Sequence, residues 1–364
     1  MHRAYNFNAG PSAISLSVLE KAHQELLDFK GTGMSIMEHS HRGKDYENVH
    51  NEAISLIKEL LSLSEDYQVL FLQGGASLQF SMIPMNFLPA GKKAAYVMTG
   101  AWSERAYEEA EKVGDIYEAA STKDGNYCRI PRLDELKYSQ DDVYLHITSN
   151  NTIFGTQWHE FPDTGKVPII CDMSSDILAK PMKCIEKFGL IYAGAQKNLG
   201  PSGVTVVIAK NELLEKANSC PKMPTMLKYS TYTKNNSLYN TPPTFAIYLM
   251  SLVLAEVKKI GGVEAMYKRN SEKAALIYDT IDKSNGFYKG HAEKDSRSIM
   301  NITFRMKTEE LEKQFLKEAG AAGFVGLAGH RSVGGLRASA YNAVPYEACK
   351  ALQEFMTGFM NKNG

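Results

Sequence analysis

One lysine of this chain lies in a segment of small residues that directly follows an apolar run. The run 189–192 leads into the segment AGAQKNLGP at 193–201, which contains Lys197. An apolar run that ends in a turn of Gly and Ala predicts a buried strand that delivers its lysine into a narrow cleft. Desolvation there favours the neutral amine, which can add to an aldehyde or abstract a proton. Taken alone, a lysine is more often a solvated surface charge.

A carboxylate follows another predicted strand. The apolar run at 167–171 ends at Asp172. An aspartate in this position is often only a helix cap or a turn residue. Asp172 and Lys197 together, each after a predicted strand, are what a pyridoxal phosphate (PLP) site requires. The carboxylate keeps the ring nitrogen protonated, so that the ring accepts electrons, and the lysine carries the aldehyde as a Schiff base.

Two further segments follow predicted strands and could complete such a site. The sequence GGAS at 74–77 combines glycines, which let backbone N–H groups converge, with a predicted helix N-terminus and the hydroxyl of Ser77. This combination is typical of an anion cradle, although a Gly-Gly pair is more often just a turn. Trp102 follows the strand predicted at 94–98, where its indole could stack on a cofactor ring or simply belong to the core.

Two loops concentrate cationic side chains far apart in the sequence. The first is HSHRGK at 39–44, with His41 and Arg42, and the second is GHRSVGGLRAS at 329–339. Arginine is suited to forked recognition of carboxylates and phosphates. The two loops therefore favour a substrate with a carboxylate at one end and another anion at the other, against the alternative of ordinary surface charge. We predict no metal site, because no spacing completes a set of four ligands.

Composition limits the classes of function. The 364 residues are 44% hydrophobic, enough for a large core and two lobes. Lys+Arg and Asp+Glu both number 41, so zero net charge argues against nucleic acid or an anionic membrane as the main partner. The five cysteines have no metal-ligand spacing, and neither a signal peptide nor a membrane span is evident. We expect a cytoplasmic protein with reduced thiols.

The elements that must position these residues alternate along the chain. Strands are predicted at 68–72, 94–98, 143–148, 167–171, 189–192 and 204–209, interleaved with helical patterns. Such alternation predicts an α/β fold with a mostly parallel sheet, whose ligands gather outside the carboxyl ends of the strands. Ser77, Trp102, Thr152, Asp172 and Lys197 all fall just after a strand. We expect a large domain at 16–264 and a smaller α+β domain formed by 1–15 and 265–364.

These motifs together resemble one family along essentially the whole chain: the phosphoserine aminotransferases, PLP enzymes of the class V aminotransferases with fold type I. The resemblance begins with YNFNAGPS at 5–12 and continues through HSHRGK at 39–44 and YAGAQKN at 192–198. It extends to YNTPPTF at 239–245 and the segment 329–339. The two His-Arg pairs are specific to this member of the class.

The resemblance implies a role for each candidate residue. Lys197 would bind the cofactor aldehyde, Asp172 would pair with the ring nitrogen, Trp102 would stack on the ring, and Thr152 would hydrogen-bond near the phenolic oxygen. The cofactor phosphate would be held by Ala76, Ser77 and Gln196, and from the other subunit of a homodimer by Asn240 and Thr241. The substrate would be held by Arg337 at its α-carboxylate, and at its phosphate or side-chain carboxylate by His41, Arg42, His330 and Arg331.

The implied reaction is reversible, ping-pong amino transfer from L-glutamate to 3-phosphohydroxypyruvate, giving O-phospho-L-serine and 2-oxoglutarate. The sequence leaves open whether 4-phosphohydroxythreonine, an intermediate of pyridoxine biosynthesis, is also a substrate. One alternative is another class V PLP enzyme, such as an alanine–glyoxylate aminotransferase or a cysteine desulfurase. The other is a catalytically silent PLP-fold protein, although such a protein would be expected to lose Lys197 or Asp172.

Overall fold

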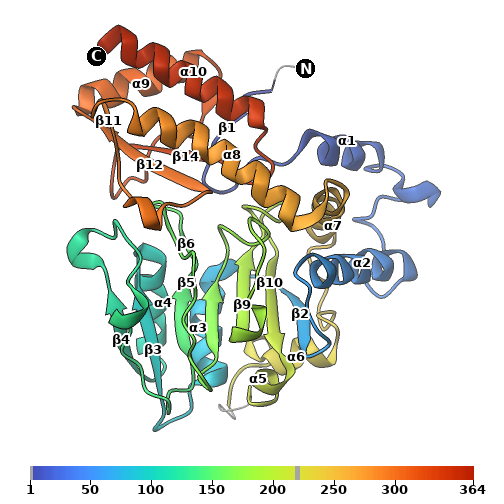
Figure 1. Ribbon diagram of the computed structural model, residues 1–364. Helices are drawn as coiled ribbons and strands as arrows, with labels where there is room; N and C mark the ends of the chain where they lie inside the picture. Colours follow the sequence, from blue (N-terminus) through green and yellow to red (C-terminus); the bar gives the residue numbers. More distant parts are fainter. Residues whose placement is uncertain (1–2, 218–221) are drawn as a thin grey trace.

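A seven-stranded sheet forms the centre of the larger part of the molecule, as seen in a computed structural model that describes residues 3–217 and 222–364 (Figure 1). Cys220 lies outside the described residues. The strand order is β2-β10-β9-β8-β5-β3-β4, and only β10 runs antiparallel to its neighbours. The strands are β2 (Tyr67–Leu72), β3 (Lys93–Met98), β4 (Asp115–Ser121), β5 (Leu145–Thr148), β8 (Ile169–Asp172), β9 (Phe188–Gly194) and β10 (Thr205–Lys210).

The predicted mostly parallel α/β architecture is confirmed, with one strand that the sequence pattern missed. β4 lies at the edge of the sheet and pairs only with β3. Its residues are mostly exposed or half-buried, with one fully buried residue, Ala119. An edge strand of this kind carries no continuous apolar run, and the sequence therefore gives little sign of it.

Helices cover both faces of this sheet. Adjacent strand residues face opposite layers: Val69 belongs to the apolar cluster under α2 and α7, whereas Leu70 belongs to the cluster under α3 and α4. Strands buried on both faces read as continuous apolar runs, which explains the pattern in the sequence. The helices of this part are α1 (Leu16–Gln24), α2 (Lys44–Leu60), α3 (Gly75–Phe87), α4 (Ala101–Glu111), α5 (Asn211–Glu215), α6 (Tyr229–Lys234) and α7 (Thr244–Lys259).

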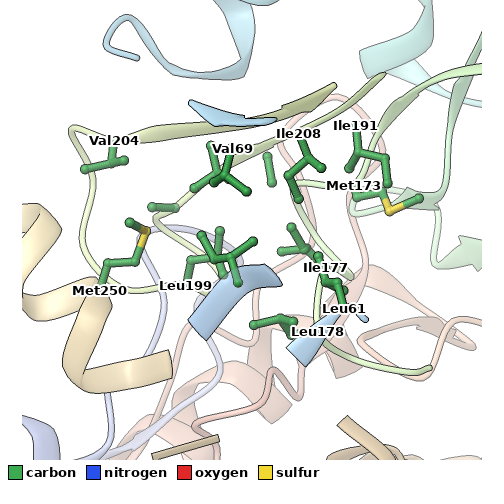
Figure 2. Close-up of a cluster of buried hydrophobic side chains, with 14 of the residues drawn as sticks. Leu61, Val69, Met173, Ile177, Leu178, Ile191, Leu199, Val204, Ile208 and Met250 are labelled. Atoms are coloured by element: carbon green, nitrogen blue, oxygen red, sulfur yellow. The ribbon is translucent and has the colours of Figure 1, made fainter. Parts of the chain in front are cut away.

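Apolar side chains anchor the turns that leave the ends of the strands. Figure 2 shows Met173 and Ile177, which flank the turn after β8, packed in one cluster with Leu199, which follows β9. All three side chains are at most 3% exposed. The backbone that carries Asp172 and Lys197 is therefore fixed by burial on the side away from the site.

The C-terminal part of the chain builds a second, smaller sheet above the first (Figure 1). Its antiparallel strands are β11 (Tyr288–Gly290), β12 (Asn301–Met306) and β14 (Leu336–Ser339), packed with α8 (Gly262–Asp282), α9 (Glu309–Ala321) and α10 (Tyr346–Asn363). The short strand β1 (Tyr5–Asn6) pairs with β13 (Phe324–Val325), and a two-stranded ribbon joins β6 (Asn150–Asn151) to β7 (Thr156–Gln157). The domain boundaries at 15/16 and 264/265 stay a prediction.

Among the described residues, no helix has the length and apolar character needed to cross a lipid bilayer.

Candidate active site

The predicted site residues leave the same edge of the large sheet. Asp172 is the last residue of β8, Thr152 follows β5 and β6, and Lys197 comes three residues after β9. Ser77 and Trp102 lie in the first turns of α3 and α4, which follow β2 and β3. Because these strands are parallel, their carboxyl ends lie together and bring the five side chains to one edge.

Lys197 is placed by contacts from three segments. Its Nζ donates a hydrogen bond to Thr152 Oγ1 at 2.8 Å and lies 5.9 Å from the centre of the Trp102 ring. Its carbonyl oxygen accepts from Ser12 Oγ at 2.6 Å. Gly10 has a φ of +147°, which residues with a Cβ rarely adopt, and a Cβ there would lie in ordinary van der Waals contact, 3.4 Å from Lys197 Cγ.

The electrostatics of the site favour a neutral lysine. Burial lowers the pKa of Lys197 to about 8, opposed by the negative charge of Asp172 and reinforced by the positive charge of Arg337. Burial also raises the pKa of Asp172, while hydrogen bonds from Ser174 and the charge of Lys197 lower it. Asp172 Oδ1 accepts from the Ser174 backbone N–H at 2.9 Å and is only 5% exposed. A buried cationic ring nitrogen is a suitable partner for this carboxylate.

The start of α3 provides an anion cradle. Gly74 and Gly75 adopt φ angles of +86° and +67°, which only glycine takes at little cost, and they turn the chain from β2 into the helix. The first N–H groups of a helix, here including those of Ala76 and Ser77, have no acceptor within the helix. They form a site for a phosphate group. Gln196 lies on the turn before Lys197, where its side chain covers Gly194.

Arg337 reaches the site from the C-terminal part of the chain. It lies on β14, and its Nη1 donates to the carbonyl oxygen of Thr152 at 3.1 Å. Arg337 Nε and Trp102 Nε1 are buried and have no hydrogen-bond partner within the described chain. Buried hydrogen-bond donors normally have an acceptor. Two donors without one, beside a buried lysine and carboxylate, therefore indicate that a polar ligand binds in this site. The residues therefore fit pyridoxal phosphate together with a carboxylate substrate.

His330 and Arg331 lie close to this site. The positive charges of Arg337, Arg331 and Arg105 contribute, after burial, to lowering the pKa of His330. The sequence patterns did not single out Arg105, whose guanidinium carbon lies 4.9 Å from the Trp102 ring centre. The sequence did offer a signal for Arg105: it follows Trp102 by three residues on a predicted helix, a spacing that places two side chains next to each other. Tyr341 was not predicted either, although its hydroxyl donates to Ala9 O at 2.8 Å beside the site.

The remaining four predicted residues form a separate group. Thr241 Oγ1 lies 3.2 Å from His41 Nδ1, and the Asn240 side chain donates to the Thr241 carbonyl oxygen at 3.3 Å. Within the described residues, no hydrogen bond or ion pair links His41, Arg42, Asn240 or Thr241 to Lys197. One chain thus holds two parts of the predicted site. Gln73, the residue before the anion cradle, contacts the second part by donating from Nε2 to the Thr241 carbonyl oxygen at 3.4 Å. No cluster of metal-ligating side chains occurs among the described residues.

The architecture around the large sheet agrees with the comparisons to known proteins. The family model described as "Aminotransferase class-V" matches residues 4–352. The chain therefore belongs to the class V aminotransferases, whose cofactor is pyridoxal phosphate.

Individual relatives show which aminotransferases of this class the chain is similar to. The phosphoserine aminotransferase of Lysinibacillus sphaericus (strain C3-41) is 65% identical over 361 residues, 99% of each chain. The solved phosphoserine aminotransferase from Bacillus circulans subsp. alkalophilus is 58% identical with a TM-score of 0.97, covering 100% of this chain and 99% of that one. A PLP-bound phosphoserine aminotransferase from Trichomonas vaginalis is 39% identical with a TM-score of 0.92, covering 98% and 100%. Within its class, the chain belongs to the phosphoserine aminotransferases.

Proposed function

We propose that this chain transfers the amino group between L-glutamate and 3-phosphohydroxypyruvate, giving O-phospho-L-serine and 2-oxoglutarate. The observation that carries the proposal is the meeting of Lys197, Thr152 and Arg337 at one sheet edge, with Asp172 buried beside them. The residue roles below are part of the proposal. The same relatives support a place in L-serine biosynthesis.

Pyridoxal phosphate supplies an aldehyde for covalent attachment and a protonated ring that withdraws electrons from the substrate Cα. Lys197 is the attachment point, because a pKa of about 8 leaves about half of its amine neutral at pH 8 and Thr152 Oγ1 orients it. When the amino substrate occupies the site, the amine of Lys197 would accept the proton from the substrate Cα and hold it at Nζ. Asp172 would keep the ring nitrogen protonated, and the indole of Trp102 would hold the ring by stacking.

Recognition of the substrate rests on cations with unused donors. Arg337 presents its unpartnered Nε and the rest of its fork to the α-carboxylate. His330 and Arg331 face the phosphate of one substrate or the side-chain carboxylate of the other, both of which are anions. Ala76, Ser77 and Gln196 hold the cofactor phosphate at the start of α3.

The active enzyme is a homodimer in this proposal. Asn240 and Thr241 reach the cofactor phosphate of the partner subunit, and the His41–Thr241 contact takes His41 and Arg42 to that same partner site. The neighbouring segment exposes large apolar side chains, with Leu27 84%, Met37 51% and Met34 42% exposed. Apolar side chains gathered this way are typical of an interface, and we place the partner subunit there. We keep a cytoplasmic location as part of the proposal.

A coupled assay tests the specificity. Glutamate-dependent amination of 3-phosphohydroxypyruvate should be much faster than amination of hydroxypyruvate, because the phosphate has His330 and Arg331 as partners. Equal rates with and without the phosphoryl group would contradict the proposal. 4-Phosphohydroxythreonine belongs in the same assay, since it offers the same anionic groups.

A further inference from the structure

A second buried carboxylate lies behind Asp172. Asp176 follows it by four residues, in the turn that leaves β8, and is 6% exposed. Its Oδ1 accepts a hydrogen bond from the Ser149 hydroxyl, and its Oδ2 accepts one from Gln157 Nε2 at 3.0 Å. Both hydrogen-bond partners are neutral. The positive charge of Lys180 acts on the carboxylate, but no hydrogen bond or ion pair joins the two side chains among the described residues. Burying a charge in this way costs folding free energy, so we expect this carboxylate to have a specific role.

Ser149 connects Asp176 to the backbone of Asp172. Its hydroxyl and its backbone N–H each lie 3.0 Å from the Asp172 carbonyl oxygen. The Ser149 side chain therefore touches Asp172 on one side and the Asp176 carboxylate on the other. With Asp176 holding the hydroxyl, the end of β8 is fixed against the end of β5.

Gln157 connects Asp176 to the C-terminal part of the chain. Its Oε1 accepts from the Ile299 backbone N–H at 3.1 Å, and Ile299 lies two residues before β12. Because that N–H can only donate, the amide of Gln157 must turn its Nε2 toward Asp176. The path therefore runs from Ile299 through Gln157 and Asp176 to the Ser149 hydroxyl, whose single proton is donated to Asp176, while the Ser149 backbone N–H donates to the Asp172 carbonyl oxygen.

We propose that Asp176 is a positioning residue. It holds the Asp172 carboxylate in place for the cofactor ring nitrogen through Ser149, and ties it to the segment before β12 through Gln157. The inference rests on the role proposed above for Asp172.

The path makes a demanding prediction about Asp176→Asn. The variant keeps the shape of the side chain, but its new NH2 group must face either the NH2 group of Gln157 or the Ser149 hydroxyl. Only the second orientation avoids two facing donors, and it reverses the hydrogen bond that Asp176 accepts from Ser149. Gln157 cannot turn over to restore the original direction of that hydrogen bond without losing the bond from the Ile299 N–H. Adding Gln157→Glu replaces the facing donor with an acceptor and keeps the acceptor for Ile299. The double variant restores the path and the number of charges.

The test measures PLP binding rather than turnover. Equilibrium dialysis of each apoprotein should show that Asp176→Asn raises the Kd for PLP about tenfold, the lower end of the range for residues that orient a metal ligand. The double variant Asp176→Asn/Gln157→Glu should return to within about twofold of the wild-type value, well inside one tenfold step. Asp142→Asn is the matched control, because Asp142 is also buried and accepts from Tyr117 and Ser139 at a remote edge of the sheet.

Each outcome decides the question. An unchanged Kd in Asp176→Asn, with a lowered apoprotein Tm, would show a purely structural role and overturn the inference. Weakened binding that the double variant fails to rescue would overturn it as well. If Asp176→Asn does not fold, Ser149→Ala removes the connecting hydroxyl and keeps the backbone N–H, and it should weaken PLP binding in the same way. Normal binding by that variant would then refute the path.

Asp172→Asn separates this inference from the proposed function. If that variant binds PLP with a normal Kd and a normal visible spectrum, the proposed role of Asp172 fails and the inference fails with it. If Asp172→Asn weakens binding or alters the spectrum while Asp176→Asn does neither, only the inference about Asp176 is wrong.

Discussion

At the scale of single residues, the chemistry of the protein depends on one desolvated amine. Lys197 is held by Thr152 and lies close enough to Asp172 for each to shift the pKa of the other. A surface lysine stays protonated well above neutral pH, and burial is what changes this. Because the Lys197 side chain ends in the site and not in the hydrophobic core, replacing it should affect the chemistry and leave the packing of the core intact.

Lys197→Ala should abolish transamination while the protein still folds. Proton transfer by a positioned base contributes about 10²–10⁴-fold, and loss of the covalent attachment adds to this deficit. Activity and the visible absorption of the holoenzyme after borohydride treatment are the measurements, with the apoprotein Tm as control. Near-normal turnover, or borohydride fixation of the cofactor at another residue, would rule out the assignment.

The rate at which the apoprotein takes up PLP should rise with pH and level off above about 8. The pKa of Lys197 is lowered to about 8, so the reactive neutral amine forms as the pH passes that value. A stopped-flow pH series with excess PLP gives the midpoint. A midpoint near 10.5, the usual value for lysine, would show that the amine is not desolvated.

At the scale of elements, strand ends and helix starts carry the site. The turn from β2 into α3 needs two left-handed residues in succession, and a Cβ at Gly74 would come within 2.6 Å of Leu78 Cδ2. A side chain at that position therefore strains the start of the helix. The cradle for the cofactor phosphate follows from this start.

Gly74→Ala should lower both the Tm and the affinity for PLP. The left-handed backbone costs about 1–2 kcal/mol for a residue with a Cβ, and the contact with Leu78 adds to it. Gly91→Ala is the control, because Gly91 has a φ of +77° but a Cβ there would have nothing within 4 Å. Equal losses of stability in the two variants would show that the Leu78 contact costs nothing.

β5 carries a buried histidine that should make the protein sensitive to acid. His146 is 1% exposed, and its Nε2 lies 2.9 Å from Tyr192 Oη. Burial lowers its pKa from 6.5 to about 3. Between these values the unfolded chain binds one more proton than the native state, so this residue reduces the free energy of unfolding as the pH falls from 6.5 toward 3.

His146→Gln should therefore flatten the pH dependence of stability. Urea midpoints of the apoprotein at about pH 7.5 and about pH 5 should differ less in this variant than in the wild type, with His50 still contributing because burial lowers its pKa to about 4. His23→Gln, at an exposed position, should keep the wild-type difference. An unchanged difference in His146→Gln would contradict the assigned pKa.

At the scale of the whole molecule, the described chain holds two separate groups of site residues. Lys197, Asp172 and Arg337 lie on one side, and His41 and Thr241 lie together elsewhere. A dimer with twofold symmetry would bring the second group of each chain to the first group of the other.

Mixing two inactive variants tests this arrangement. Lys197→Ala and Arg42→Ala homodimers should each be nearly inactive. After unfolding and refolding together, half of the dimers are hybrids with one intact site, so activity should return to about a quarter of the wild-type value. Refolding each variant alone is the control. No recovery in refolded mixtures would show that Arg42 serves the site of its own chain.

The sequence by itself determined the alternation of the predicted strands with helices and the positions of Lys197 and Asp172 after two buried strands. Apolar runs in a sheet covered on both faces are visible locally, and a parallel sheet gathers its carboxyl ends at one edge. Edge strand β4, with one fully buried residue, carries no such pattern. Only the tertiary structure brought Arg337 to Thr152, Arg105 to Trp102 and Asp176 to Ser149. These contacts join segments, or fix side-chain directions, that hydrophobic periodicity does not encode.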